Sequence, residues 1–176
     1  LPPLYAGGQL IRPGTPGVIF AVPGVPTRGT PDDDLIIGTT EPDFIFGMAG
    51  NDTICGGDGA DHIYGDDGTD DVEPGNDLIH GEDATDELYG GGGNDAIYGG
   101  NNHPNNPDNE YLEGGDGVDR LYGENGADTL TCGTDVPGSQ DAGDLGNGGT
   151  GMPGNAPEAD RNLLGDCPLA LNIETL

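Results

Sequence analysis

Residues 47–64 read GMAGNDTIC GGDGADHIY, two consecutive nine-residue blocks on one template, GGxGxDxUx, in which U is aliphatic. Five further blocks follow it: GDDGTDDVE (65–73), GEDATDELY (81–89), GGGGNDAIY (90–98), GGDGVDRLY (114–122) and GENGADTLT (123–131). A degenerate opening copy (37–46), a copy two residues short (74–80) and a copy six residues long (99–113) bring the total to ten. A repeat with this period predicts a solenoid.

Each template position has a structural role. Gly at positions 1, 2 and 4 permits positive φ and close backbone approach, so residues 1 to 6 of each copy are expected to form a turn with converging carbonyls. The last three residues are expected to form a strand in which position 8 points inward. Two copies then make one coil. Position 8 is aliphatic throughout, and the predicted core is Ile45, Ile54, Ile63, Val72, Ile79, Leu88, Ile97, Leu112, Leu121 and Leu130.

Position 6 adds a carboxylate to each turn. Ca²⁺ takes six to eight oxygen ligands, so one turn supplies about half a shell and two stacked turns complete it. Successive turns alternate between the two edges of the coil. The ligands expected at one edge are Asp52, Asp70, Asp86, Glu110 and Asp128, and those at the other are Asp43, Asp61, Asp77, Asp95 and Asp119. The turn before Asp77 is too short for a full set of carbonyls, and Glu110 replaces Asp after a long insertion.

The repeats resemble those of the RTX (repeat-in-toxin) calcium-binding family over about residues 37–135. The resemblance implies a parallel β-roll held together by several Ca²⁺ ions, with the position-6 carboxylates and the turn carbonyls as ligands. With two copies to a coil, the prediction is an all-β roll of about five coils.

Three regions are predicted along the chain. A Pro/Gly-rich apolar arm (1–34) precedes the roll (35–135), and an irregular loop with a C-terminal cap follows it (136–176). Solenoids need caps at their ends, and a disulfide between Cys132 and Cys167 would stabilise such a cap. Cys55 would then be unpaired. Two free thiols are the alternative.

The charge balance narrows the class of partner. The chain has 33 acidic residues against 4 Arg and no Lys, for a net charge of −29. Nucleic acid and anionic membranes are poor partners for such a chain, whereas multivalent cations are natural ones. The sequence contains no apolar run of about 20 residues, so no membrane-spanning helix is predicted. Because the aliphatic core is thin relative to the cost of ordering the backbone, calcium binding is expected to supply folding free energy.

No catalytic constellation stands out. The three histidines (His62, His80 and His103) occur in no HExxH motif, and Ser139 lies in no nucleophile elbow. Cys55 is expected on the outer face of one sheet, and His62 and His80 on that of the other, which would keep the cysteine apart from both histidines. The prediction is therefore a protein that is not an enzyme.

Two functions fit this pattern best. The first is a secreted structural or adhesive protein that calcium folds and stiffens, with self-assembly into an extracellular polymer as a further hypothesis. The alternative is a non-catalytic accessory module of a larger secreted enzyme or toxin. A calcium-dependent carbohydrate binder is a third hypothesis. The extracellular location follows from three Cys in an acidic, Lys-free chain.

An aromatic ladder is expected on one sheet. Its predicted members are Phe44, Phe46, Tyr64, His80, Tyr98 and Tyr122. An uncovered apolar stripe usually marks an interface. The acid-free arm is a candidate cover, and we expect it to dock on this face or at an edge of the roll, in its own molecule or in a neighbouring copy.

Overall fold

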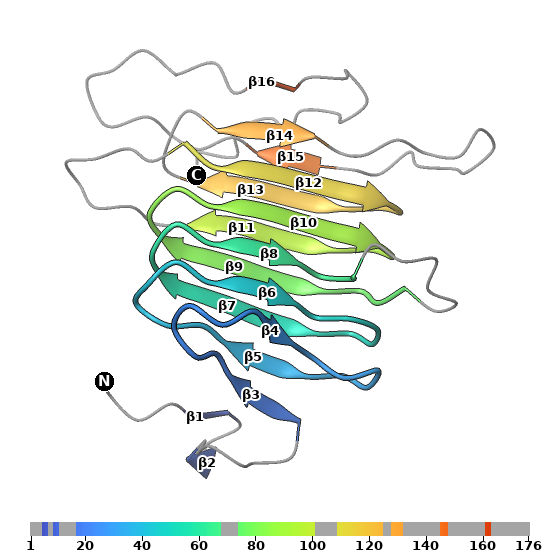
Figure 1. Ribbon diagram of the computed structural model, residues 1–176. Helices are drawn as coiled ribbons and strands as arrows, with labels where there is room; N and C mark the ends of the chain where they lie inside the picture. The colour runs from blue at the N-terminus through green and yellow to red at the C-terminus, as the bar shows by residue number, and fades with distance from the viewer. Residues whose placement is uncertain are drawn as a thin grey trace.

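The computed structural model describes residues 17–67, 74–100, 109–124 and 128–131, together with the backbone of four short strands at 5–6, 9–10, 145–147 and 161–162. Its central feature is a parallel β-solenoid built from two seven-stranded sheets (Figure 1), whose ten core-forming strands make about five coils. The described residues contain no helix. These findings confirm the predicted all-β roll.

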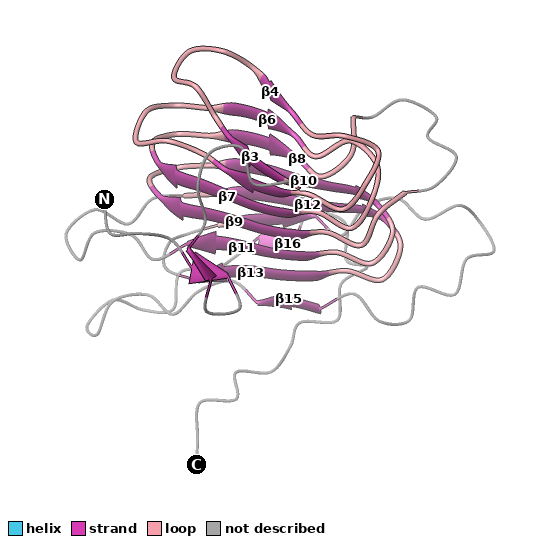
Figure 2. Cartoon of the chain, turned by 90° about the horizontal axis from the view of Figure 1, so that it is seen from below, coloured by secondary structure: helices cyan, strands magenta, loops and turns pink. Residues whose placement is uncertain are grey.

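The strands alternate between the two sheets along the chain. The even-numbered sheet contains β4 (Thr27–Arg28), β6 (Phe44–Phe46), β8 (His62–Tyr64), β10 (Glu87–Gly92), β12 (Tyr111–Asp116), β14 (Thr129–Thr131) and β16 (Arg161–Asn162). The odd-numbered sheet contains β3 (Val18–Phe20), β5 (Leu35–Ile37), β7 (Thr53–Asp58), β9 (Leu78–Asp83), β11 (Ala96–Gly100), β13 (Arg120–Glu124) and β15 (Leu145–Asn147). Two further strands, β1 (Tyr5–Ala6) and β2 (Gln9–Leu10), pair antiparallel with each other. Figure 2 shows the stacked strands from below.

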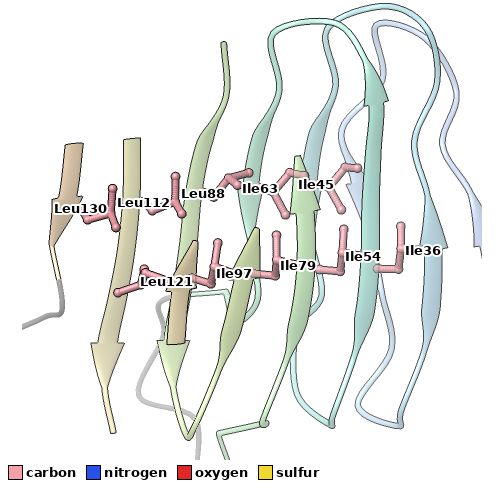
Figure 3. Close-up of a cluster of buried hydrophobic side chains, with 10 residues drawn as sticks. All are labelled: Ile36, Ile45, Ile54, Ile63, Ile79, Leu88, Ile97, Leu112, Leu121 and Leu130. Carbon is pink, nitrogen blue, oxygen red and sulfur yellow. The ribbon is translucent and has the colours of Figure 1, made fainter. Parts of the chain in front are cut away.

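The core is a double row of aliphatic side chains, one from each strand from β5 to β14 (Figure 3). Ile54 and Ile79 are register partners in the odd-numbered sheet, as are Ile63 and Leu88 in the even-numbered sheet. The predicted core positions are confirmed with one exception: Val72 lies outside the described residues. Ile36 is a further core residue that the repeat analysis missed, and Ile19 packs against it and its neighbours.

The coil register differs from the prediction after Tyr64. The two predicted copies at 65–73 and 74–80 act as one lengthened copy, because the next strand after β8 is β9. β9 pairs with β7, and His80 is the register partner of Cys55. Every later strand therefore lies in the sheet opposite to the one predicted. A turn can absorb extra residues at little cost, whereas each strand must keep its aliphatic position in the core.

The aromatic residues are consequently divided between two ladders, and the predicted single ladder is wrong. On the even-numbered sheet, Tyr64 stacks between Phe46 (5.2 Å between centroids) and Tyr89 (4.7 Å). On the odd-numbered sheet, Tyr98 stacks between His80 and Tyr122, at 4.7 Å each. Neighbouring rings are nearly parallel and cover each other's faces, so the ladders stabilise their own sheets. The single face on which the expected self-association rested is not formed.

The segment expected to be an arm contributes to the roll. β3 pairs with β5 and β4 pairs with β6, so both sheets continue through residues 18–28. The guanidinium of Arg28 lies 4.3 Å from the centre of the Phe46 ring, as a cation–π contact. This part of the chain docks at the end of its own stack. Cys132 and Cys167 lie outside the described residues, and the disulfide-bonded cap at 136–176 stays a prediction.

Candidate metal centre

The position-6 carboxylates form two rows, one before each set of strands. The strands of the two sheets run in opposite directions, so the rows lie at opposite edges of the roll (Figure 1). The odd-numbered sheet is preceded by Asp34, Asp52, Asp77, Asp95 and Asp119. The even-numbered sheet is preceded by Asp43, Asp61, Asp86, Glu110 and Asp128. None of these side chains is more than 6 % exposed.

This arrangement corrects the predicted edges. Asp77 stacks on Asp52, and Asp86 stacks on Asp61, because β9 pairs with β7 and β10 pairs with β8. Asp70, a predicted ligand, lies outside the described residues. Glu110 occupies its row as the aspartates do, buried to 1 % exposure. Asp34 belongs to the odd row and was missed.

From Asp52 and Asp61 onward, one oxygen of the aspartates in both rows accepts a hydrogen bond from the coil before it. The backbone N–H of Asp52 donates to Asp77 Oδ1, and that of Asp77 donates to Asp95 Oδ1, both at 2.8 Å. At the other edge, the N–H of Asp61 donates to Asp86 Oδ1 at 2.9 Å. Asp77 is thus fully integrated, although its copy departs from the template. The ladder fixes each carboxylate and leaves the second oxygen for another partner.

The second oxygen is buried and receives no hydrogen bond in four described residues, Asp52, Asp61, Asp77 and Asp95. It points toward the position-1 glycine of its own copy. A Cβ on Gly47 would lie 2.5 Å from Asp52 Oδ2 and would also collide with the carbonyl oxygen of Gly65 in the next coil. The glycine therefore leaves open a small volume that a carboxylate oxygen and a carbonyl oxygen both face.

We call this volume, bounded by a position-1 glycine, a carboxylate oxygen and a carbonyl oxygen of the next coil, the cradle, and it recurs along both rows. A Cβ on Gly90 would lie 2.5 Å from the carbonyl oxygen of Gly114 and would meet Asp95 Oδ2, and Gly56 has the corresponding neighbours in Asp61 and Gly81. All the donors are oxygens, one of them charged. Such a set suits a hard divalent cation such as Ca²⁺ better than a thiophilic metal.

Burial makes these carboxylates costly to charge without a cation. Desolvation raises the pKa of Asp52, Asp61 and Asp77 from 3.8 to about 7, and that of Asp95 to about 8. The backbone hydrogen bond to each lowers its pKa, and neighbouring carboxylates raise it further. A bound divalent cation would compensate both the burial and the repulsion.

No group of three or more His, Cys, Asp or Glu side chains converges on one point within the described part of the chain. Each site would therefore combine a carboxylate from one turn with backbone carbonyls. This is the donor set that the repeat predicts.

The expected separation of Cys55 and His80 is wrong, since the two are neighbours on the odd-numbered sheet. The thiol of Cys55 is free and half-buried. Burial raises the pKa of this thiol most, and the negative charge of Glu82 raises it further. A raised pKa keeps the thiol protonated, whereas a nucleophilic cysteine needs a lowered one. The pairing therefore adds no argument for catalysis. Among the described residues, no helix has the length and apolar character to cross a membrane.

Two features of the site escaped the repeat analysis. Asp34 and Ile36 belong to GTPDDDLII (29–37), which keeps positions 1, 6 and 8 of the template but lacks its other glycines. The residues at position 5 form an exposed ladder of asparagines at the edge where the strands of the odd-numbered sheet begin. Asn76 donates through its N–H (2.9 Å) and its Nδ2 (3.0 Å) to Asn51 Oδ1. Asn94 donates in the same way to Asn76 Oδ1. The Asn at position 5 in these copies was the available signal.

A comparison with protein-family models finds four copies of the RTX calcium-binding nonapeptide repeat, at residues 28–63, 56–75, 73–103 and 105–135. They cover more than half of the chain and include both rows of carboxylates. No curated protein and no solved structure gives a match.

Proposed function

The chain belongs to the family of RTX calcium-binding nonapeptide repeats, and from this premise we propose that it is an extracellular structural module folded and stiffened by Ca²⁺. The ions would lie between stacked turns at both edges of the roll. Their ligands would be the second carboxylate oxygens that receive no hydrogen bond, those of Asp52, Asp61, Asp77 and Asp95 among them, with carbonyl oxygens from the adjacent coil.

The observation that carries this proposal is the space beside the position-1 glycines of the later turns, such as Gly47, Gly56 and Gly90. Asp52 Oδ2 is buried beside the carbonyl of Gly65 with no hydrogen bond to satisfy it. A buried carboxylate oxygen without a partner costs several kcal/mol at an order-of-magnitude level. Ca²⁺ supplies the missing charge and accepts both kinds of oxygen.

The charge of the whole chain supports the same role. A net charge of −29 opposes compaction, and the two rows place carboxylates on successive coils at strand spacing. Binding free energy then contributes to folding, because the unfolded chain has no assembled sites. Each site contributes about 2.7 kcal/mol when free calcium is 100 times its Kd.

The extracellular location rests on the expected affinity. Each turn offers one carboxylate, and extracellular calcium modules of low ligand charge have Kd values of about 10⁻⁴ to 10⁻³ M. Calcium at that level would hold the roll folded outside a cell. The roll then serves as a rigid spacer or scaffold.

Circular dichroism tests the proposal. At pH 8 the chain should lack β structure in a chelator and gain it in millimolar Ca²⁺, with a Tm that rises with calcium concentration. Mg²⁺ at equal concentration is the control, because it keeps its water shell and demands octahedral geometry. A chain that is equally folded with and without calcium would refute the proposal.

A further inference from the structure

The first two turns of the roll differ in backbone conformation from the later ones, except the turn that begins at Gly65, in which Asp66 at position 2 has no positive φ. Position 2 has positive φ at Met48, Gly57, Glu82, Gly91, Gly100, Gly115 and Glu124, and position 4 has it at Gly50, Gly59, Ala84, Gly93 and Gly117. The turns that begin at Gly29 and Gly38 carry Thr30 and Thr39 at position 2, and neither has positive φ. Position 4 in these turns is also non-glycine and has ordinary φ.

This conformation changes what the carboxylate contacts. The backbone N–H of Thr30 donates to Asp34 Oδ2 at 2.6 Å, and the Thr30 hydroxyl donates to the same oxygen at 2.8 Å. The N–H of Thr39 donates to Asp43 Oδ2 at 2.6 Å. In the later turns, the corresponding oxygens of Asp52 and Asp61 receive no hydrogen bond.

The threonine hydroxyls hold this alternative turn in place. Thr39 Oγ1 accepts the N–H of Glu41 at 3.1 Å, and Thr30 Oγ1 accepts that of Asp32 at 3.3 Å. Such turns are a common role of Thr, since its hydroxyl bonds the backbone two residues on.

The cradle is altered as well. A Cβ on Gly29 would lie 3.1 Å from Asp34 Oδ2, compared with 2.5 Å between Gly47 and Asp52 Oδ2. A Cβ on Gly38 would meet only backbone atoms of the next coil among its three nearest neighbours. The carboxylates of the first two turns have thus moved away from the volume that the later turns leave open.

We infer that the turns of Thr30 and Thr39 bind no calcium, and that these threonines mark where the calcium array begins. The inference rests on the proposed function. Donor hydrogens face the oxygen that would contact the ion, and an N–H aimed at a site repels a cation. The first two turns are closed by hydrogen bonds in place of calcium.

Asp43 has a second buried oxygen, Oδ1, at this end of the roll. Asp43 Oδ1 is buried without a hydrogen bond, because the residue at the corresponding place in the preceding coil, Val25, donates its N–H to Val22 O at 3.0 Å. In that coil the residues before Thr27 form the tight turn Val22–Val25, and not a six-residue turn with converging carbonyls. It offers Ca²⁺ no second half-shell.

The test counts bound calcium per molecule of the full chain after equilibrium dialysis, by elemental analysis. D34N and D43N should bind as many ions as the unmodified chain, since an amide oxygen still accepts the threonine hydrogen bonds. The matched variants D52N and D61N should lose at least one ion each. If D52N or D61N fails to fold, D34N and D43N still decide the question. Loss of an ion in either of them overturns the inference.

A second variant tests the cause. T39G combined with E41G gives the turn sequence GGTGPD, with glycine at the positions that adopt positive φ in later turns. It should bind one ion more than the unmodified chain, and an unchanged count overturns the assignment to these residues. An unmodified chain that binds no calcium at all would instead defeat the proposed function, so the two failures are distinguishable.

Discussion

Gly90→Ala is expected to disrupt the roll even at saturating calcium. The added methyl group would enter the volume faced by Asp95 Oδ2 and the carbonyl of Gly114, and the carbonyl belongs to a strand that cannot shift alone. It would take the place of the proposed ion as well as clash. The expected loss is at the upper end for a point substitution, about 4 kcal/mol or more. Calcium-dependent thermal unfolding measures it.

Gly24→Ala is the matched control. Gly24 has a φ of +73° at the tip of a tight turn, and nothing lies within 4 Å of the position of its Cβ. Alanine there adds only backbone strain, about 1–2 kcal/mol. Gly90 has no positive φ, so its alanine adds no such strain, and a loss at Gly90 no larger than that at Gly24 would contradict the filled cradle.

Acid is expected to promote folding of the calcium-free chain. The pKa of Asp52, Asp61 and Asp77 is about 7 in the fold, and that of Asp95 is about 8, against 3.8 when exposed. The folded state therefore binds protons more tightly than the unfolded state. Stability from these groups is greatest below pH 4 and is lost as the pH rises toward 8.

Calcium reverses this dependence, because the ion needs the ionised carboxylate. At pH 8 the fold should require calcium, and near pH 5 it should depend on calcium much less. Circular dichroism across pH 4–8, in metal-free buffer and in millimolar Ca²⁺, distinguishes the two regimes. A metal-free chain that loses β structure on acidification would show that these carboxylates are not buried as described.

Much of the fold could be predicted from one position of the repeat. Position 8 is aliphatic in every copy, and a solenoid core needs one such side chain per strand, so the stacked row from Ile45 to Leu130 could be predicted with Val72 as the untested member. Ile36 was missed because its copy keeps Asp34 but not the template's glycines. Its turn is closed by Thr30, which makes positive φ unnecessary.

The assignment of strands to sheets could not be predicted, because it depends on counting coils through residues 65–77. Residues 65–80 contain two matches to the template, and periodicity alone cannot tell whether each match adds a strand to the stack. Pairing of His80 with Cys55 decides the count. One miscounted copy reversed the edges of the carboxylate rows, divided the aromatic ladder and brought Cys55 beside His80.

The chemistry of the site was predictable only in outline. A carboxylate beside a glycine-rich turn indicates a hard cation, and the rows confirm that the carboxylates align. Which oxygen is already satisfied depends on tertiary contacts, such as the N–H of Asp52 on Asp77 Oδ1. Thr39 and Gly57 both occupy position 2, but only the backbone angles show that Gly57 has positive φ and Thr39 does not.

Anomalous diffraction from crystals grown in calcium tests the central claim most directly. The account predicts anomalous density beside Oδ2 of Asp52, Asp61, Asp77 and Asp95, within coordination distance of the carbonyl oxygens in the adjacent coil. An ordered roll in saturating calcium with no anomalous density at these four oxygens would contradict it.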